Sequence, residues 1–316
     1  MTSHDLSYAT ASTPPIRRWF IRAIENLSGR HRLLKIYYRW RAESAGGPRM
    51  WRDALDMIGA RLELNGPADW LDRLPDGPLI VIANHPFGIA DGVAILSIAE
   101  RIGRPYRVLS YSDFMRLPEL QAIALPIDFN ETKEALATNL KTRSEARRLL
   151  KEGVTLVIFP AGGVATAEKP FGKAEELPWK LFTARLIQQS GATVLPVYFE
   201  GQNSPLFHFV SRYSVSLRLS LLVLEFGRRI GATIRATVGA PVSWTEIAAS
   251  ADGGSVIDEL YVRVHRLAPG GESADRAALL PRPIHQRRRY PWDPPREAAP
   301  LAKPAFRGSG DVSQRR

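Results

Sequence analysis

Residues 79–91 read Leu79-Ile80-Val81-Ile82-Ala83-Asn84-His85-Pro86-Phe87-Gly88-Ile89-Ala90-Asp91. The first five residues are apolar and are bounded by Pro78 and Pro86, which is typical of a short buried strand. Apolar residues spaced through 92–102 predict a helix after the turn. His85 and Asp91 therefore lie at the two ends of one strand-to-helix turn.

This turn carries the groups that a general base needs. Loops at the carboxyl ends of strands in α/β folds are where ligands and catalytic groups collect. An aspartate there can hold one imidazole nitrogen and leave the other to accept a proton. Such a pair also arises by chance in a chain with six histidines, so a structural histidine in a turn is the alternative interpretation.

Strand and helix patterns alternate along the chain from residue 61. We expect strands at 61–65, 79–83, 106–110, 125–128, 154–159, 193–199 and 232–238, and helices at 91–102, 131–151, 174–190, 205–226 and 244–267. This order predicts an α/β fold with a mixed, largely parallel sheet flanked by helices. The capping-box pattern Ser243-Trp244-Thr245-Glu246 supports the start of the last helix.

The composition limits the class of protein. The chain has 316 residues, 45% of them hydrophobic, which is enough for one domain of about 200–250 residues plus extensions. It has no cysteine, which excludes disulfides, thiolate metal sites and a cysteine nucleophile. No apolar run is long enough for a transmembrane helix, and residues 1–15 lack the pattern of a secretory signal. We therefore expect the protein in the cytoplasm or on the cytoplasmic face of the membrane.

The charge calls for an anionic partner. The formal net charge is +11 and the pI is about 10.1, and both nucleic acid and an anionic bilayer would attract such a chain. Residues 14–42 interleave Trp, Tyr and Leu with Arg and Lys, as a helix in a membrane interface does. An amphipathic helix packed on the domain is the alternative, and both can hold at once. We found no nucleic-acid motif, so we expect no nucleic-acid partner.

Two further strand ends carry small or polar residues. The strand at 154–159 leads into Phe159-Pro160-Ala161-Gly162-Gly163, and the strand at 193–199 leads into Glu200-Gly201-Gln202-Asn203-Ser204. Glycine and small residues at such positions let backbone N–H groups face a ligand oxygen. These segments join the His85 turn at one predicted edge of the sheet.

The three segments in this order resemble the glycerolipid (lysophospholipid) acyltransferase superfamily. The motifs that carry the resemblance are Asn84-His85-Pro-x-Gly, Phe159-Pro160-Ala161-Gly162 and Leu195-Pro196-Val197-Tyr198-Phe199-Glu200-Gly201-x-Asn203-Ser204. They are most similar to the bacterial branch near the hemolysin-like and ornithine-lipid acyltransferases. The resemblance covers about residues 60–245 and is specific for the superfamily, but not for the substrate.

The resemblance implies an O-acyltransferase of lipid metabolism, in phospholipid biosynthesis or a related path. Its general base would be His85, oriented by Asp91. The base takes a proton from a lysolipid hydroxyl, which then attacks the thioester of acyl-CoA or acyl-carrier protein. The co-substrate is that thioester, and no cofactor or metal is implied. The residues expected to bind substrate are Asn84, Gly88, Phe159, Pro160, Ala161, Gly162, Gly163, Glu200 and Asn203.

The chain departs from the superfamily pattern in two places. Five residues separate His85 from Asp91, where four are usual, although five occur in the branch named above. The usual second motif is Phe-Pro-Glu-Gly-Thr-Arg-Ser, and Val164 stands where that Arg would bind a phosphate. Its absence favours lyso-ornithine lipid or another amino-acid-linked lysolipid over lysophosphatidate, with a one-chain phospholipid next. Lys169 and Lys173 are the nearest candidate replacement cations.

The resulting prediction divides the chain into four parts. These are a disordered N-terminus (1–13), basic-aromatic amphipathic helices (14–60), an acyltransferase domain (61–268) and a disordered Pro/Arg-rich tail (269–316). The protein would bind peripherally to an anionic membrane surface. A catalytically degenerate lipid-binding or scaffold protein on the same fold is the alternative, and a metal-dependent hydrolase ranks lower because further ligands are not recognisable.

Overall fold

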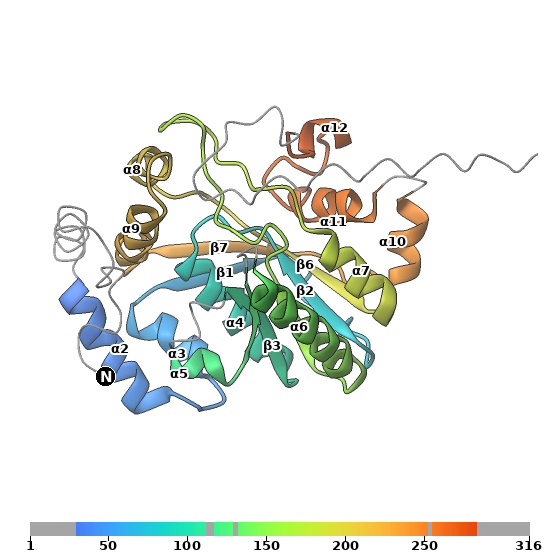
Figure 1. The fold of residues 1–316 in the computed structure, drawn as a ribbon, viewed down its shortest axis with the longest axis horizontal. Helices are drawn as coiled ribbons and strands as arrows, with labels where there is room; N and C mark the ends of the chain where they lie inside the picture. Colours follow the sequence, from blue (N-terminus) through green and yellow to red (C-terminus); the bar gives the residue numbers. More distant parts are fainter. Residues whose placement is uncertain (1–29, 112–116, 129–131, 252–254, 283–316) are drawn as a thin grey trace, which may run out of the picture.

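The computed structural model describes residues 30–111, 117–128, 132–251 and 255–282 (Figure 1). Within these residues seven strands form one sheet in the order β1-β7-β6-β2-β5-β3-β4. The strands are β1 (Arg61–Asn65), β2 (Leu79–Ala83), β3 (Tyr106–Tyr111), β4 (Ala124–Ile127), β5 (Thr155–Ile158), β6 (Thr193–Phe199) and β7 (Thr233–Val238). All seven predicted strands are confirmed, with ends that differ by at most one residue.

The sheet is mixed and largely parallel, as predicted. Only the β6–β7 pair is antiparallel among the described strands, with Val197 opposite Val238 and Phe199 opposite Ala236. Because β7 runs backwards, it begins at the edge of the sheet where β2, β5 and β6 end. The connections that follow these three strands and the one that enters β7 therefore meet at one edge.

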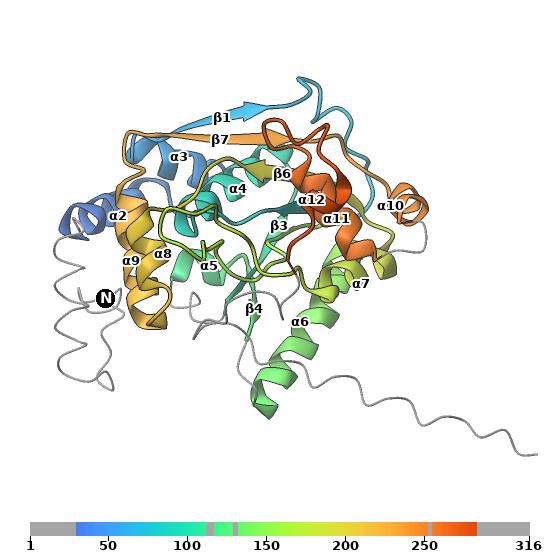
Figure 2. The ribbon, with the colours of Figure 1, turned by 90° about the horizontal axis from the view of Figure 1, so that it is seen from above.

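Helices cover both faces of the sheet (Figures 1 and 2). The helices in the described part of the chain are α2 (Arg30–Ser44), α3 (Met50–Met57), α4 (Ile89–Ile102), α5 (Pro118–Gln121), α6 (Lys133–Lys151), α7 (Leu181–Ser190), α8 (Pro205–Val210), α9 (Val215–Gly227), α10 (Trp244–Ser250), α11 (Val256–His265) and α12 (Arg276–Leu279).

The central strand β2 shows why both faces need cover. Its five residues are apolar and at most 1% exposed. Leu79, Val81 and Ala83 pack into one core cluster with α3 and α4, whereas Ile80 and Ile82 pack into a second cluster with α6, α7 and α11. Alternate residues of a strand point to opposite faces, so an uninterrupted apolar run requires a helical layer on each side.

Three predicted helices differ from the structure. The helix expected at 174–190 begins only at Leu181, because Thr166 and Glu175 form an antiparallel bridge upstream of it. The helix expected at 205–226 is divided into α8 and α9, and the hydroxyl of Ser214 caps the start of α9. The helix expected at 244–267 is divided into α10 and α11. Apolar periodicity alone does not reveal such breaks.

The segment before β1 packs on the domain where the structure describes it. Trp40 of α2 and Trp51 of α3 are buried in the core, and the Trp40 indole N–H donates to the carbonyl of Met50 over 2.7 Å. Helices α2 and α3 agree with the helices expected at 14–60, while residues 1–29 lie outside the described residues. None of the described helices is long and apolar enough to cross a membrane.

Regular structure continues past residue 268, where the tail was expected to begin. Helix α12 follows, and Arg276 in it pairs with the buried carboxylate of Glu259. Farther on, Arg282 pairs with Glu175 over 2.9 Å and with Glu168 over 3.3 Å. Residues 269–282 are therefore packed against the domain, and residues 283–316 of the expected tail lie outside the described residues.

The end of β2 is tied to the end of β6 by one side chain. Asn84 is 5% exposed, and its amide nitrogen donates to the carbonyl of Phe199 over 2.9 Å. The backbone N–H of Phe199 donates in turn to the amide oxygen of Asn84 over 2.6 Å. Two strands that end at the same edge are thus held in register by a side chain.

We predict that Asn84→Ala lowers the free energy of unfolding by about 2–6 kcal/mol. Phe199 is fully buried, and the substitution leaves both its N–H and its C=O unpaired, at about 1–3 kcal/mol each. Urea denaturation measures the loss. The matched control is Asn65→Ala, at the exposed end of β1, which we expect to cost less than about 0.5 kcal/mol. Equal losses in the two variants would contradict the prediction.

Candidate active site

The turn after β2 can be built only with glycine at position 88. Gly88 has a φ of +89°, and a Cβ there would lie 2.9 Å from Leu222 Cδ2 and 3.1 Å from Val164 Cγ2. A side chain would meet both the strained backbone region and these neighbours. The turn is therefore tight, and α4 begins directly after it at Ile89.

Asp91 lies in the first turn of α4 and faces His85. Its carboxylate is fully buried; Oδ2 accepts from the backbone N–H of Phe87 over 2.8 Å, and Oδ1 lies 3.1 Å from His85 Nδ1. Neither Nδ1 nor Oδ1 has a hydrogen-bond partner by geometry among the described residues, so the two groups face each other at 3.1 Å without a fully formed hydrogen bond. The five-residue spacing thus brings the predicted base and its orienting carboxylate together.

The imidazole of His85 is held from one side and open on another. Its ring stacks on Phe159, with centroids 4.0 Å apart and an interplanar angle of 24°. The backbone N–H donates to Glu176 Oε1 over 2.8 Å, and the carbonyl accepts from the N–H of Ala165 over the same distance. Since 17% of the side chain remains exposed, the ring can still be reached from solvent.

The second motif, residues 159–163, mainly supports His85, and little of it faces solvent. Phe159 provides the stacking surface, and Ala161 is fully buried in the core cluster between the sheet and α6, α7 and α11. The carbonyl of Pro160 accepts from the N–H of Lys180, and the exposed Gly162 closes a turn onto the carbonyl of Phe159. Gly163 is partly exposed. Of this motif, the two glycines are the residues best placed to meet a substrate.

The third motif holds the same turn from the other side. Asn203 is 2% exposed, and its amide nitrogen donates to the carbonyl of Phe87 over 3.3 Å. Asn84 bonds the backbone of Phe199 in the same way. Both amides that were predicted to bind substrate therefore bond the backbone. Glu200 is partly exposed, and its backbone N–H donates to the carbonyl of Arg235. Lys169 and Lys173 are exposed on a hairpin between β5 and α7.

Glu176 is a residue that sequence reasoning missed. Besides accepting from His85, it accepts from the Trp179 indole N–H over 3.1 Å, and its Oε2 lies 3.5 Å from His265 Nε2. Burial raises the pKa of Glu176 to about 7 and lowers the pKa of His265 to about 4. Glu176 stands in a charged stretch that was predicted as a helix, so nothing in its sequence context distinguished it from a surface glutamate.

Two arginines that the sequence did not single out also hold the site. The guanidinium of Arg218, in α9, donates to the carbonyl of Val164 and the hydroxyl of Thr166, both over 2.6 Å. Arg229, just after α9, lies over the ring of Phe87 at 3.9 Å and donates to the carbonyl of Gln202. Burial lowers the pKa of Arg229. Both cations come from the segment that enters β7.

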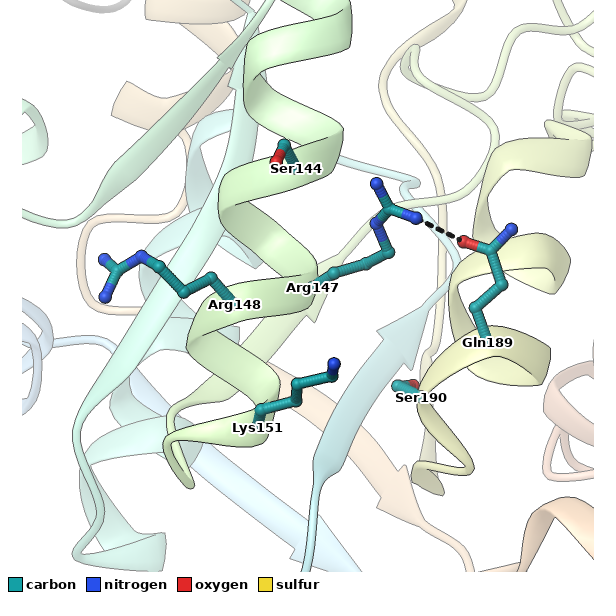
Figure 3. A pocket seen from close by; sticks show the side chains of 6 residues that line it. All are labelled: Ser144, Arg147, Arg148, Lys151, Gln189 and Ser190. Atoms are coloured by element: carbon teal, nitrogen blue, oxygen red, sulfur yellow. Dashed lines mark hydrogen bonds between the residues drawn. The ribbon is translucent and has the colours of Figure 1, made fainter.

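The arginines of α6 lie elsewhere. A hollow between the C-terminal ends of α6 and α7 is lined by Arg147, Arg148 and Lys151, and Figure 3 shows Arg147 reaching towards Gln189 while Arg148 points away. Arg148 pairs with Glu145 and Glu152. Because α6 leads into the start of β5, this hollow lies at the edge of the sheet opposite His85.

The described residues hold no group of three or more His, Asp or Glu side chains placed to bind a metal ion. The turn therefore presents one imidazole, that of His85, which has a buried carboxylate 3.1 Å from its Nδ1 and is accessible from solvent. That arrangement suits proton abstraction from a substrate hydroxyl.

Comparison with known proteins gives the family of the chain. A sequence model of the family described as Acyltransferase matches residues 57–265, about two thirds of the chain. The protein belongs to this acyltransferase family and is an acyltransferase. The resemblance to the glycerolipid acyltransferase superfamily is thereby confirmed, and the matched range includes all three motifs.

Two curated relatives are similar to this chain in sequence. The chain is 26% identical over 208 residues to a lyso-glycine lipid O-acyltransferase of Phocaeicola vulgatus, which covers 60% of this chain and 67% of the relative. It is 26% identical over 209 residues to a lyso-glycine lipid O-acyltransferase of Bacteroides thetaiotaomicron, at 60% and 69%.

A solved structure was also found. The 1-acyl-sn-glycerophosphate acyltransferase PlsC of Thermotoga maritima matches at 17% identity and a TM-score of 0.41, over 65% of this chain and 73% of that one. A likeness at that TM-score is too weak to support an argument.

We predict that the titration of Glu176 lowers the free energy of unfolding as the pH rises. Between pH 4.5 and about 7 the folded protein keeps a proton on Glu176 that the unfolded chain has released, so stability falls as pH rises through this interval. The shift corresponds to a loss on the order of 3 kcal/mol. Urea denaturation at a series of pH values measures it in the native protein and in Glu176→Gln, which carries no titrating group there.

The free energy of unfolding of the native protein minus that of Glu176→Gln should fall by this amount across the interval. The control Glu175→Gln alters the neighbouring, partly exposed carboxyl and should follow the native pH dependence. Parallel curves for the native protein and Glu176→Gln would contradict the prediction.

Proposed function

We propose that this acyltransferase moves an acyl chain from a thioester donor to the hydroxyl of a lysolipid, with His85 as the general base. The observation that carries the proposal is the His85–Asp91 pair, in which the two side chains are 3.1 Å apart and the imidazole remains accessible. The names of the two relatives support a lysolipid acceptor and an oxygen as the acylated atom.

The geometry supports the following proton transfers. With Asp91 at Nδ1, the imidazole carries its proton on that nitrogen and presents a lone pair on Nε2. Nε2 takes the proton of the acceptor hydroxyl as its oxygen attacks the thioester carbonyl. The carbon–sulfur bond then breaks, the ester forms, and the imidazolium returns the proton to the thiolate. Asp91 stabilises the imidazolium between these two transfers.

The donor in this proposal is acyl-CoA or acyl-carrier protein, because both present a thioester and leave as a thiol. No covalent acyl-enzyme is required. Holding the two substrates together then supplies much of the rate, in addition to the factor of about 10²–10⁴ typical of a positioned base.

The proposed acceptor is an amino-acid-linked lysolipid, and lyso-glycine lipid is the first candidate. The relatives' names point to it, and Val164 is consistent with it, because a buried valine stands where a phosphate-binding arginine would be expected. Lyso-ornithine lipid shares the amino-acid link, and a lysophospholipid is the alternative. We place the reaction at the cytoplasmic face of the membrane.

The test is lipid mass spectrometry of cells that lack the protein, paired with assays of the purified chain on lyso-glycine lipid, lyso-ornithine lipid and lysophosphatidate. We expect one monoacylated amino-acid lipid to accumulate and to be acylated in vitro. Acylation of lysophosphatidate alone would overturn the proposed acceptor. No transfer to any acceptor from either donor would favour a catalytically degenerate lipid-binding protein.

We predict that His85→Ala lowers kcat at least about 10²- to 10⁴-fold, because the base is removed. The control is His31→Ala, which replaces an exposed histidine of α2 and should leave the rate unchanged. Unfolding curves of each variant test whether the fold is kept. Complementation by His85→Ala at the level of the native protein would mean that His85 is structural.

Asp91→Asn gives a second, independent prediction. An amide can still accept from the N–H of Phe87, but it no longer stabilises a charged imidazolium. We expect kcat to fall about 10²- to 10⁴-fold while KM for the acceptor changes little. Initial rates over a range of acceptor concentrations separate the two constants. A rise in KM with an unchanged kcat would assign Asp91 to substrate binding instead.

A further inference from the structure

The hairpin of residues 166–175 presents an aromatic side chain to solvent. Thr166 and Glu175 pair at its base, and the N–H of Gly172 closes the tip onto the carbonyl of Lys169. Phe171 stands at this tip and is 90% exposed, more than any other large hydrophobic residue in the described part of the chain. Exposed lysines at 169 and 173 flank it.

The hairpin is fastened to the third motif. The side chain of Gln202 accepts from the N–H of Ala174 over 2.9 Å and donates to the carbonyl of Gly172 over 3.0 Å. At the base, the N–H of Ala165 bonds the carbonyl of His85. The exposure of Phe171 is therefore built into a braced loop whose base touches the catalytic histidine.

Helix α8 and the turn after it extend the same surface. Phe209 is 47% exposed and Tyr213 62%, and their rings lie 5.4 Å apart, with Leu206 also exposed nearby on α8. Hydrogen bonds from Ala167 to His208 and from Arg218 to Thr166 join this helix pair to the hairpin. Figures 1 and 2 both show α8 beside the hairpin.

The exposed charge at the tip of the hairpin is basic. Lys169 and Lys173 are exposed at the tip, whereas Glu168 and Glu175 of the same hairpin both pair with Arg282, and residues 201–224 contain no Asp or Glu. Exposed aromatic side chains among basic residues fit the headgroup region of an anionic bilayer, where rings reach the acyl boundary and cations meet lipid phosphates. An apolar patch of this kind on a water-soluble surface marks an interaction site.

We infer that the hairpin tip (residues 169–173) and α8 with its following turn (residues 205–213) dock on an anionic lipid bilayer. The inference deepens the proposed function and rests on it, because a bilayer is where a lysolipid acceptor resides. Docking through this face sets the His85 turn at the membrane surface. This surface is separate from α2, which turns Trp40 inwards.

The absence of cysteine from the chain allows a direct test. Phe171→Cys in the full chain is labelled with an environment-sensitive fluorophore and mixed with vesicles of phosphatidylglycerol and phosphatidylethanolamine. Leu136→Cys is the matched control, because Leu136 is 60% exposed on α6, which both views place apart from α8. We expect a blue shift and brighter emission at position 171 only, weakened by salt and by replacement of the anionic lipid with phosphatidylcholine.

A label at position 171 that responds no more than the one at 136 would overturn the inference, whether or not the chain sediments with the vesicles. This readout needs no turnover. If the acceptor assays fail while position 171 enters the bilayer, the proposed function falls and the docking face stands.

Unlabelled variants give the affinity. Phe171→Ser should lower the vesicle partition coefficient about tenfold, as expected when one aromatic side chain is withdrawn from an apolar phase. Turnover of a short-chain, freely dispersed acceptor should be unchanged. Lys169→Glu with Lys173→Glu should lower the partition coefficient by a similar factor or more on anionic vesicles. Unchanged partitioning of both variants would contradict the docking face.

Discussion

Asp91 carries a carboxylate with no exposed surface, and a buried charge of this kind is costly unless its oxygens have partners. One oxygen takes the N–H of Phe87 and the other faces His85. The turn must therefore close tightly enough to bring both groups to one carboxylate, which is why Gly88 is required between them. The neighbouring motifs then serve the turn: Phe159 supports the imidazole ring, and Asn203 holds the carbonyl of Phe87.

A second buried carboxyl, that of Glu176, supports His85 through its backbone. Glu176 binds the backbone of His85, whereas Asp91 faces its ring, so the two acids divide the positioning of one residue between them. Their environments differ, because Glu176 sits among Trp179 and the imidazole of His265, with a pKa raised by burial. Burial favours the neutral form of Glu176 at moderately acidic pH, and this carboxyl meets the backbone of His85 and not its ring.

The sequence predicted the strands and the pairing of His85 with Asp91 because both are local. Residues 79–83 are apolar without interruption, and five residues separate His85 from Asp91 on one turn, so predicting either feature needs no knowledge of distant contacts. Glu176, Arg218 and Arg229 were missed because their roles depend on long-range packing that no periodicity records. For the same reason Asn84 and Asn203 were predicted to bind substrate, although their amides bond the backbone of Phe199 and Phe87.

The reversed strand β7 has a consequence for how this protein family can vary. In an all-parallel sheet, only the segments that leave a strand lie at the edge where β2 ends and His85 follows. A strand that runs the other way also delivers the segment that precedes it, and here that segment is α9 with Arg218 and Arg229. Changes in this incoming helix can then alter how the His85 turn is supported, while His85 and Asp91 stay the same. A single inversion of chain direction thus brings a segment that precedes a strand to the side of the sheet where His85 lies.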